Sequence, residues 1–433
     1  MNESPNNQRL TNFLFVQTAN KGAIMEKQQW RKKYLTILSG QTVSLIGSSA
    51  VQFALIWWLT NESKSAIMLS LAGLSAYLPQ MLLGPFVGVW LDRLKRKYVV
   101  IFADLIMGLV ALILSLWFLW GNPGYLVVIA ALFLRALANV FHMPSIQAIV
   151  PLLVPEEELV KANSWNQFLQ SGAFMLGPVL GAAMFAAMPL WLILLTDLIG
   201  ALAACLTLWI VEVPSIPRSE ESMQHYLQEL KDGFNVFKED RPMLVVMFFS
   251  FFIMIFYLPL GILFPLMTNV HFELSAWFAS VVEFSYAAGM MVSAFLIGMK
   301  KEWREKLLAA QLANIGLAIT FIGSGLVPAN LTGYWMFVFF CILMGGVGNL
   351  YNIPFTAYLQ ETIAPEKLGR VFSLFGSVMS GAMPIGLLLA GPLSEKLGIA
   401  RWFLISGILT LIFSLLCLLF YRRAKAKGNQ QAD

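Results

Sequence analysis

Charged residues are scarce in this sequence. Asp, Glu, Lys and Arg make up 12% of its 433 residues, whereas 58% are hydrophobic and the mean hydropathy is +0.72. Soluble globular domains carry roughly 25% charged residues. The uncharged runs repeatedly exceed the ~20 residues that a helix needs to cross a bilayer. The composition therefore excludes a soluble globular protein and predicts a multi-pass membrane protein.

Residue patterns typical of catalysis and metal binding are missing from the sequence as well. The three cysteines and three histidines are scattered, and each cysteine lies inside a hydrophobic run. There is no phosphate-binding glycine loop, no zinc-ligand spacing and no nucleophile elbow. We therefore expect no enzymatic activity, no cofactor and no metal site. The longest apolar run before Tyr34 is FLFV, so no cleavable signal peptide is expected either.

The hydrophobic runs predict an all-α membrane protein with twelve spans. The expected ranges are 34–60, 66–91, 98–120, 124–150, 164–187, 189–211, 242–268, 275–299, 306–328, 331–358, 370–393 and 400–421. An even number of spans places both termini on the same side. Of the 29 Lys and Arg residues, 25 fall on that side and three on the other, namely Lys64, Lys396 and Arg401. Because Lys and Arg concentrate in cytoplasmic loops, we expect cytoplasmic termini in a bacterial cell membrane and no nucleic-acid partner.

Two stretches of the sequence align at an offset of 210 residues. They are NVFHMPSIQAIVPLLVP, from Asn139 to Pro155, and NLYNIPFTAYLQETIAP, from Asn349 to Pro365. One asparagine and two prolines coincide, and the stretches occupy equivalent predicted spans. This repeat favours two duplicated six-span halves with a substrate path between them.

The polar connection between the halves carries apolar residues at helical spacing, which predicts an amphipathic helix on the inner membrane surface. The expected domains are a cytoplasmic N-terminal segment 1–33, a first half 34–211, a linker 212–241, a second half 242–421 and a cytoplasmic tail 422–433.

The stretch GVWLDRLKRK, which begins at Gly88, concentrates charge between the second and third spans. It resembles the loop signature of the major facilitator superfamily, although Lys95 stands where glycine is usual there. The resemblance implies a cytoplasmic gate, in which Gly88 permits close helix contact and Asp92 accepts hydrogen bonds from the start of the eleventh span. Arg93 and Arg96 would strengthen that contact. Simple anchoring by positive charge is the alternative, but it explains neither Gly88 nor Asp92.

Two further stretches agree with this superfamily. LFLRALANVFHMP places Arg135 in the middle of the fourth span, as the family signature does, and GAFMLGPVLGAA resembles the Gly-Pro signature of antiporters in the fifth span. Gly177 and Pro178 would bend that helix at the interface that moves during transport. An ordinary kinked and closely packed helix is the alternative.

From Met25 onward the chain is similar to the macrolide efflux permeases of the drug:proton antiporter group. Stretches such as SGQTVSLIGSSAVQFALIWWLT, LLVPEEELVKANSWNQFLQS and LGRVFSLFGSVMSGAMPIG carry the resemblance. It implies an antiporter that exports bulky hydrophobic drugs, with macrolides as the first candidates, in exchange for protons. We expect a monomer, although the sequence does not itself give the oligomeric state. Related permeases export siderophores or move lysophospholipids, which leaves these substrates open. A membrane receptor that transports nothing is a further alternative, which the short polar loops disfavour.

Four ionisable residues lie inside predicted spans, where an unpaired charge costs several kcal/mol. They are Asp104, Arg135, Asp197 and Glu283. Apolar surroundings favour the protonated form of a carboxyl group, as proton coupling requires. Glu283 is therefore the first candidate for proton coupling, and Asp197 and Arg135 are further candidates. Asp197 as a structural hydrogen-bonding group is the alternative. Asp104 lies near the cytoplasmic end of its span and is expected in the gate, and the sequence leaves the acidic partner of Arg135 open.

Uncharged polar residues within the spans are candidates for the wall of a substrate cavity. We expect Gln41, Gln52, Asn139 and Asn349 there. The aromatic candidates for stacking on an amphiphilic substrate are Trp57, Trp58, Phe284 and Tyr286. Most of the 57 aromatic residues must simply face lipid or neighbouring helices, so packing is the alternative for each of them.

Overall fold

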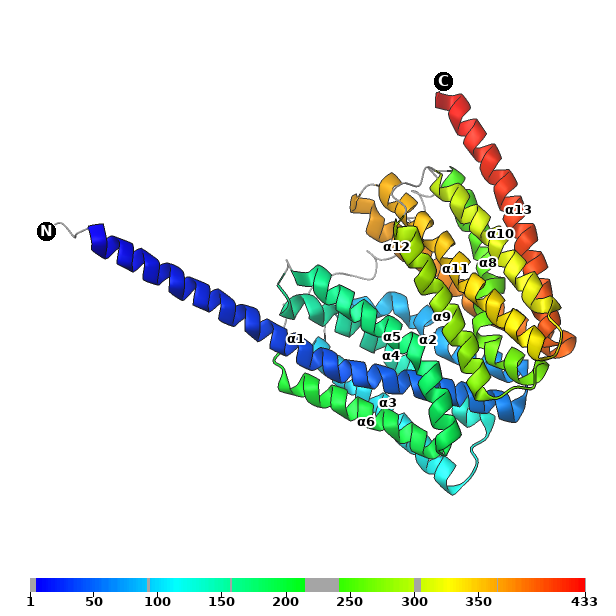
Figure 1. Ribbon diagram of the computed structural model, residues 1–433, viewed down its shortest axis with the longest axis horizontal. Coiled ribbons are helices and arrows are strands. Elements are labelled where there is room, and N and C mark those ends of the chain that lie inside the picture. Colours follow the sequence, from blue (N-terminus) through cyan, green and yellow to red (C-terminus); the bar gives the residue numbers. More distant parts are fainter. Residues whose placement is uncertain are drawn as a thin grey trace.

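The computed structural model describes residues 5–91, 94–155, 158–214, 241–299, 305–363 and 365–432. Within these ranges the chain forms helices joined by short connections (Figure 1). The helices are α1 (Pro5–Ser63), α2 (Ala66–Leu91), α3 (Arg96–Trp120), α4 (Tyr125–Leu153), α5 (Leu159–Ala187), α6 (Leu190–Ile210), α8 (Arg241–Leu266), the short π-helix η2 (Met267–His271), α9 (Ala276–Met299), α10 (Lys306–Leu326), α11 (Leu331–Thr362), α12 (Pro365–Leu397) and α13 (Ile399–Ala432).

Helices suit this sequence because a bilayer offers the backbone no hydrogen-bond partners, so each spanning segment must satisfy its own. Among the described residues, eleven helices are long and apolar enough to cross a membrane. The twelfth, α12, matches the predicted eleventh span in position and carries more small and polar residues. The predicted all-α, twelve-helix fold is confirmed.

The largest differences from the predicted ranges are at the two chain ends. α1 begins at Pro5 and α13 continues to Ala432, well beyond the hydrophobic runs that defined the spans. Hydrophobicity marks which part of a helix can lie in the bilayer, but Lys, Arg, Gln and Glu are also good helix formers, so a helix can extend beyond its apolar run. Both extensions project from one face of the bundle (Figure 1), which we call the terminal face. The opposite side, which carries the α1–α2 connection, is the far face.

The helix contacts reveal two related halves, α1–α6 and α8–α13. In the first half α1 packs against α5 and α6, α3 against α4 and α6, and α2 against α4. In the second half α8 packs against α12 and α13, α10 against α11 and α13, and α9 against α11. Each contact in one half therefore has its counterpart in the other, as a duplicated six-helix unit requires. The aligned stretches of the sequence lie on the equivalent helices α4 and α11.

The two halves meet mainly through α2 with α12 and through α5 with α9, which are again equivalent pairs. At the far face these helices approach closely. A Cβ atom added to Gly391 of α12 would lie 2.9 Å from Ser70 Cβ of α2. Phe53 and Trp57 of α1 pack with Ala182 of α5 and Ala279 of α9 in one buried apolar cluster. The halves are thus packed together at the far face.

Candidate functional site

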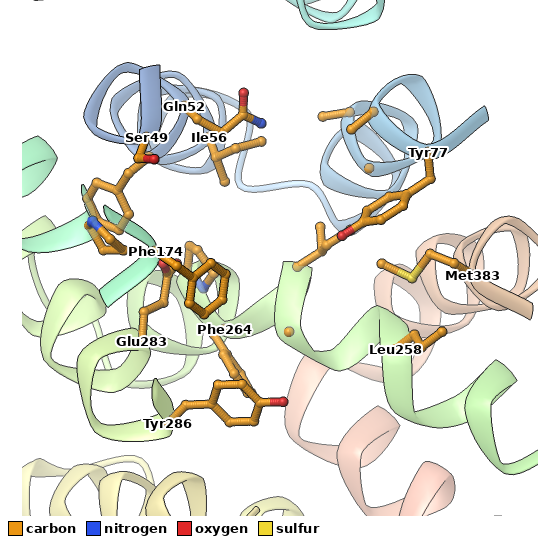
Figure 2. A pocket seen from close by; sticks show the side chains of 18 of the residues that line it. Ser49, Gln52, Ile56, Tyr77, Phe174, Leu258, Phe264, Glu283, Tyr286 and Met383 are labelled. Carbon is orange, nitrogen blue, oxygen red and sulfur yellow. The ribbon is translucent and has the colours of Figure 1, made fainter. Parts of the chain in front are cut away.

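A cavity of about 430 Å³ lies between the two halves and is bordered by helices of both. Its wall is mainly apolar and aromatic, with Phe174 from α5, Phe264 and Tyr257 from α8, and Tyr286 from α9. Figure 2 shows Gln52 of α1, Tyr77 of α2 and Glu283 of α9 around the same space. An apolar wall with few polar groups is the usual lining of a small-molecule site.

Glu283 is the acidic residue in the wall of this cavity. It lies on α9 close to Phe174 (Figure 2), and its carboxylate has no hydrogen-bond or ion-pair partner among the described residues. An acid in such a place interacts favourably with a proton or with a cationic ligand, because little else nearby compensates its charge. The wall thus offers one charged contact and a large apolar surface.

Asp197 and Arg135 form an ion pair inside the first half. Arg135 of α4 donates through Nη1 to Asp197 Oδ2 of α6, and Ser48 Oγ of α1 donates to Asp197 Oδ1 at 2.5 Å. The two charged side chains are 7% and 2% exposed. This arrangement identifies the acidic partner of Arg135, which the sequence left open. Neither residue lines the cavity that contains Glu283.

Asp104 of α3 is fully buried in the first half. Gln41 Nε2 of α1 donates to Asp104 Oδ2 at 3.2 Å, and His142 Nε2 of α4 lies 3.2 Å from Asp104 Oδ1. Gln41, expected in the cavity wall, is instead engaged with this acid and lines neither of the two cavities described here. The scattered positions of the histidines gave no signal for His142.

The residues predicted to form the cytoplasmic gate are described in part. Gly88 lies in the last turn of α2, whereas Asp92 and Arg93 fall outside the described residues. Arg96 Nη1 donates to the Ala148 carbonyl of α4 at 3.0 Å. Lys97 Nζ donates to the carbonyls of Trp209 and Val211, at 3.0 and 2.8 Å. These cations therefore bind helix carbonyls at the terminal face, as cations near helix C-termini do.

Gly177 and Pro178 lie within the continuous helix α5. A Cβ atom added to Gly177 would lie 2.5 Å from Ser49 Cβ, so α5 packs closely on α1 there. Pro178 lines the cavity beside Phe174.

A second cavity of about 590 Å³ shares Ser49 and Phe174 with the first. Asn349 of α11 lines it and donates to the Met290 carbonyl of α9 at 2.6 Å. Met290 follows Glu283 by about two turns on a helix that runs toward the terminal face, so this cavity lies nearer that face. Asn139 of α4 is exposed and lines neither cavity.

Several residues of the cavity wall were not predicted from the sequence. Tyr77, Phe174 and Tyr257 line the first cavity, and Tyr257 Oη lies 2.5 Å from Tyr286 Oη, within hydrogen-bonding distance. Aromatic residues are so frequent here that neither spacing nor composition marks these three.

Two related helical halves with a ligand-sized cavity between them define a membrane transporter. The sequence profile of the Major Facilitator Superfamily matches residues 37–312 and 306–433, and the chain belongs to that superfamily.

Among proteins similar in sequence is macrolide efflux protein A of Streptococcus pyogenes, 36% identical over 91% of this chain and 97% of that protein. Macrolide efflux protein A of Enterococcus faecalis is 34% identical over 75% of this chain and 99% of that protein. In fold, the chain is similar to a bacterial homologue of the iron transporter ferroportin in its inward-facing state, with a TM-score of 0.70 at 17% identity, covering 91% of this chain and 98% of that one.

Proposed function

We propose that this transporter exports bulky hydrophobic drugs in exchange for protons by alternating access, and that macrolides are its main substrates. The observation that carries the proposal is the cavity between the halves, where Glu283 is the acid in an aromatic wall. The sequence similarity to macrolide efflux proteins supports the choice of substrate. A macrolide that carries an amine would place its cation near Glu283 and its apolar ring against Phe174 and Tyr286.

In this mechanism Glu283 binds a proton on one side of the membrane and the drug cation on the other. When the cavity faces the more acidic side, the carboxyl binds a proton and the drug leaves. When the cavity faces the other side, the proton leaves and a cationic drug binds in its place. The Arg135–Asp197 pair fixes α4 and α6 within the first half, so that this half moves as one body.

The orientation follows from the distribution of positive charge. We propose that the termini are cytoplasmic and that the far face is extracellular, in a bacterial cell membrane, because Lys and Arg gather on the side of the termini. Both halves belong to one chain, so we propose that a monomer transports. The contact of Asp92 with the start of α12 as a cytoplasmic gate also remains a proposal.

Uptake of a radiolabelled macrolide into inside-out membrane vesicles tests this function. We expect accumulation when the vesicle lumen is acidic and its loss when a protonophore removes the gradient. Glu283→Gln mimics the protonated carboxyl, so it should bind a cationic drug more weakly, through the apolar wall alone, and should accumulate no more than vesicles without the protein. Glu361→Gln is the matched control, since Glu361 pairs with Lys306 at the terminal face, away from the cavity.

Three outcomes would contradict parts of the proposal. Gradient-driven uptake by Glu283→Gln would remove the coupling role from Glu283. Uptake by the unaltered protein that ignores the protonophore would exclude proton antiport. Transport of a lysophospholipid or siderophore, but of no macrolide, would replace the proposed substrate.

A further inference from the structure

A carboxylate from one half of the molecule caps a helix of the other half at the far face. Glu395 lies near the end of α12, and its Oε2 accepts hydrogen bonds from Ser65 Oγ at 3.0 Å, Ala66 N at 2.6 Å and Ile67 N at 3.4 Å. These three donors form the beginning of α2. The contact therefore joins the second half directly to the first.

The start of α2 favours such an acid for a physical reason. The first amide groups of a helix have no partner within the helix, and the helix dipole places partial positive charge there. Ser65 contributes part of the cap, because its Oγ accepts from Met68 N at 3.4 Å while it donates to Glu395. Glu395 accepts hydrogen bonds from the preceding backbone amides, those of Ala66 and Ile67. The cap of α2 is complete only when both halves are together.

The packing around Glu395 holds the acid in reach of α2. Gly391 lies one turn before Glu395 on α12, and a Cβ atom there would lie 3.4 Å from Ile67 Cα. A second polar contact joins the halves at the same face, where Asn269 Nδ2 donates to Asn61 Oδ1 at 3.3 Å. An outward opening that separates α2 from α12 must break the contacts of Glu395.

We propose that Glu395 is a latch that holds the far face closed, and that releasing it is part of every transport cycle. The inference rests on the alternating access proposed above. It is also the counterpart of the gate predicted at the other end of the same helix pair. There an acid that follows α2 would cap α12, whereas here an acid at the end of α12 caps α2. Each cap would then stabilise one of the two end states of the cycle.

Distances between spin labels across the far face test the latch. The labels are placed at Asn122→Cys and Ala329→Cys, two exposed positions in the α3–α4 and α10–α11 connections, after Cys205, Cys341 and Cys417 are replaced by serine or alanine. In nanodiscs without drug, Glu395→Gln should raise the ratio of long to short distances by about tenfold, as expected on losing a charge-assisted hydrogen bond. Ser65→Ala should shift the ratio in the same direction by less. Glu361→Gln, in which an exposed acid of α11 is changed within one half, should leave the ratio unaltered.

An unchanged distance distribution in Glu395→Gln would overturn the latch, and so would an equal shift in Glu361→Gln. Both acids are exposed, so neither substitution disturbs a buried core. The measurement uses neither drug nor proton gradient. If the shift is seen but no macrolide is exported, the latch is supported and the proposed substrate is contradicted. If a macrolide is exported but no shift is seen, the proposed substrate is supported and the latch is contradicted.

Discussion

The ionisable residues within the helices occupy two different environments. Asp197, Arg135 and Asp104 lie inside the first half, where side chains of neighbouring helices contact them. Glu283 faces a cavity and has no partner among the described residues. A charge that is already compensated contributes to folding, while an uncompensated one in a cavity wall is available to a ligand. Substitutions at the two kinds of site should therefore have different effects.

Breaking the buried ion pair is expected to reduce stability. Asp197→Leu leaves the Arg135 cation without its partner in an apolar region, at a cost of about 3–5 kcal/mol. We expect less folded protein and a lower melting temperature of what remains, measured by size-exclusion chromatography after stepwise heating. The double variant Arg135→Met, Asp197→Leu removes both charges and should recover most of the loss.

A different result would assign the pair another role. If Asp197→Leu keeps the melting temperature of the unaltered protein but loses gradient-driven uptake, Asp197 acts in coupling rather than in folding. The double variant then stays inactive although it folds.

At the scale of helices, α9 and α11 approach so closely that only glycine fits at their crossing. A Cβ atom on Gly289 would lie 2.0 Å from the Ile342 carbonyl oxygen, and one on Gly345 would lie 2.1 Å from the Tyr286 carbonyl oxygen. Small residues allow helices in a membrane to pack in this way. The crossing also positions Tyr286, whose side chain lines the cavity. The packing of two helices thus determines part of the cavity wall.

Adjacent glycines of α11 provide a matched test of this crossing. Gly345→Ala forces the helices apart at Tyr286 and should cost about 1–3 kcal/mol, as overpacking does. Gly346→Ala should have little effect, because its nearest neighbour, the Gly289 carbonyl oxygen, would lie 3.6 Å from the new atom. Melting temperature and equilibrium binding of a macrolide measure both changes. Equal behaviour of the two variants would show that the crossing tolerates a methyl group.

At the scale of the whole molecule, the two halves pack together at the far face, and a cavity lies between them. The second cavity lies nearer the terminal face and shares Ser49 and Phe174 with the first. A transporter closed on one side binds its substrate from the other. The orientation of the chain in the membrane therefore determines from which compartment the drug enters.

The proposed orientation can be tested by labelling introduced cysteines in intact cells. Asn122→Cys and Ala329→Cys, exposed on the far face, should react with an impermeant thiol reagent added outside. Ala426→Cys, exposed at the end of α13, should react only after the membrane is made permeable. The opposite pattern of labelling would contradict cytoplasmic termini and reverse the assignment of the two faces.

The sequence by itself determined the class of fold. Hydrophobic runs of bilayer length fix the spans, because unpaired backbone groups in lipid leave no alternative to helices. The repeated asparagine and prolines indicated the two halves. The sequence also singled out Arg135, Asp197 and Glu283, because charges are rare in spans.

Which helices become neighbours was decided only by the tertiary structure. Arg135 forms an ion pair with Asp197, and Gln41 donates a hydrogen bond to Asp104. Glu395 accepts a hydrogen bond from the start of α2, more than three hundred residues away in the sequence. Glu395 carried no signal in the sequence, because an acid at a helix end outside the bilayer is ordinary there. Tyr77, Phe174 and Tyr257 of the cavity wall were equally unmarked among the 57 aromatic residues. Hydrophobicity acts locally along the chain and is readable from it, whereas a polar contact between helices depends on their mutual rotation and crossing, which packing determines.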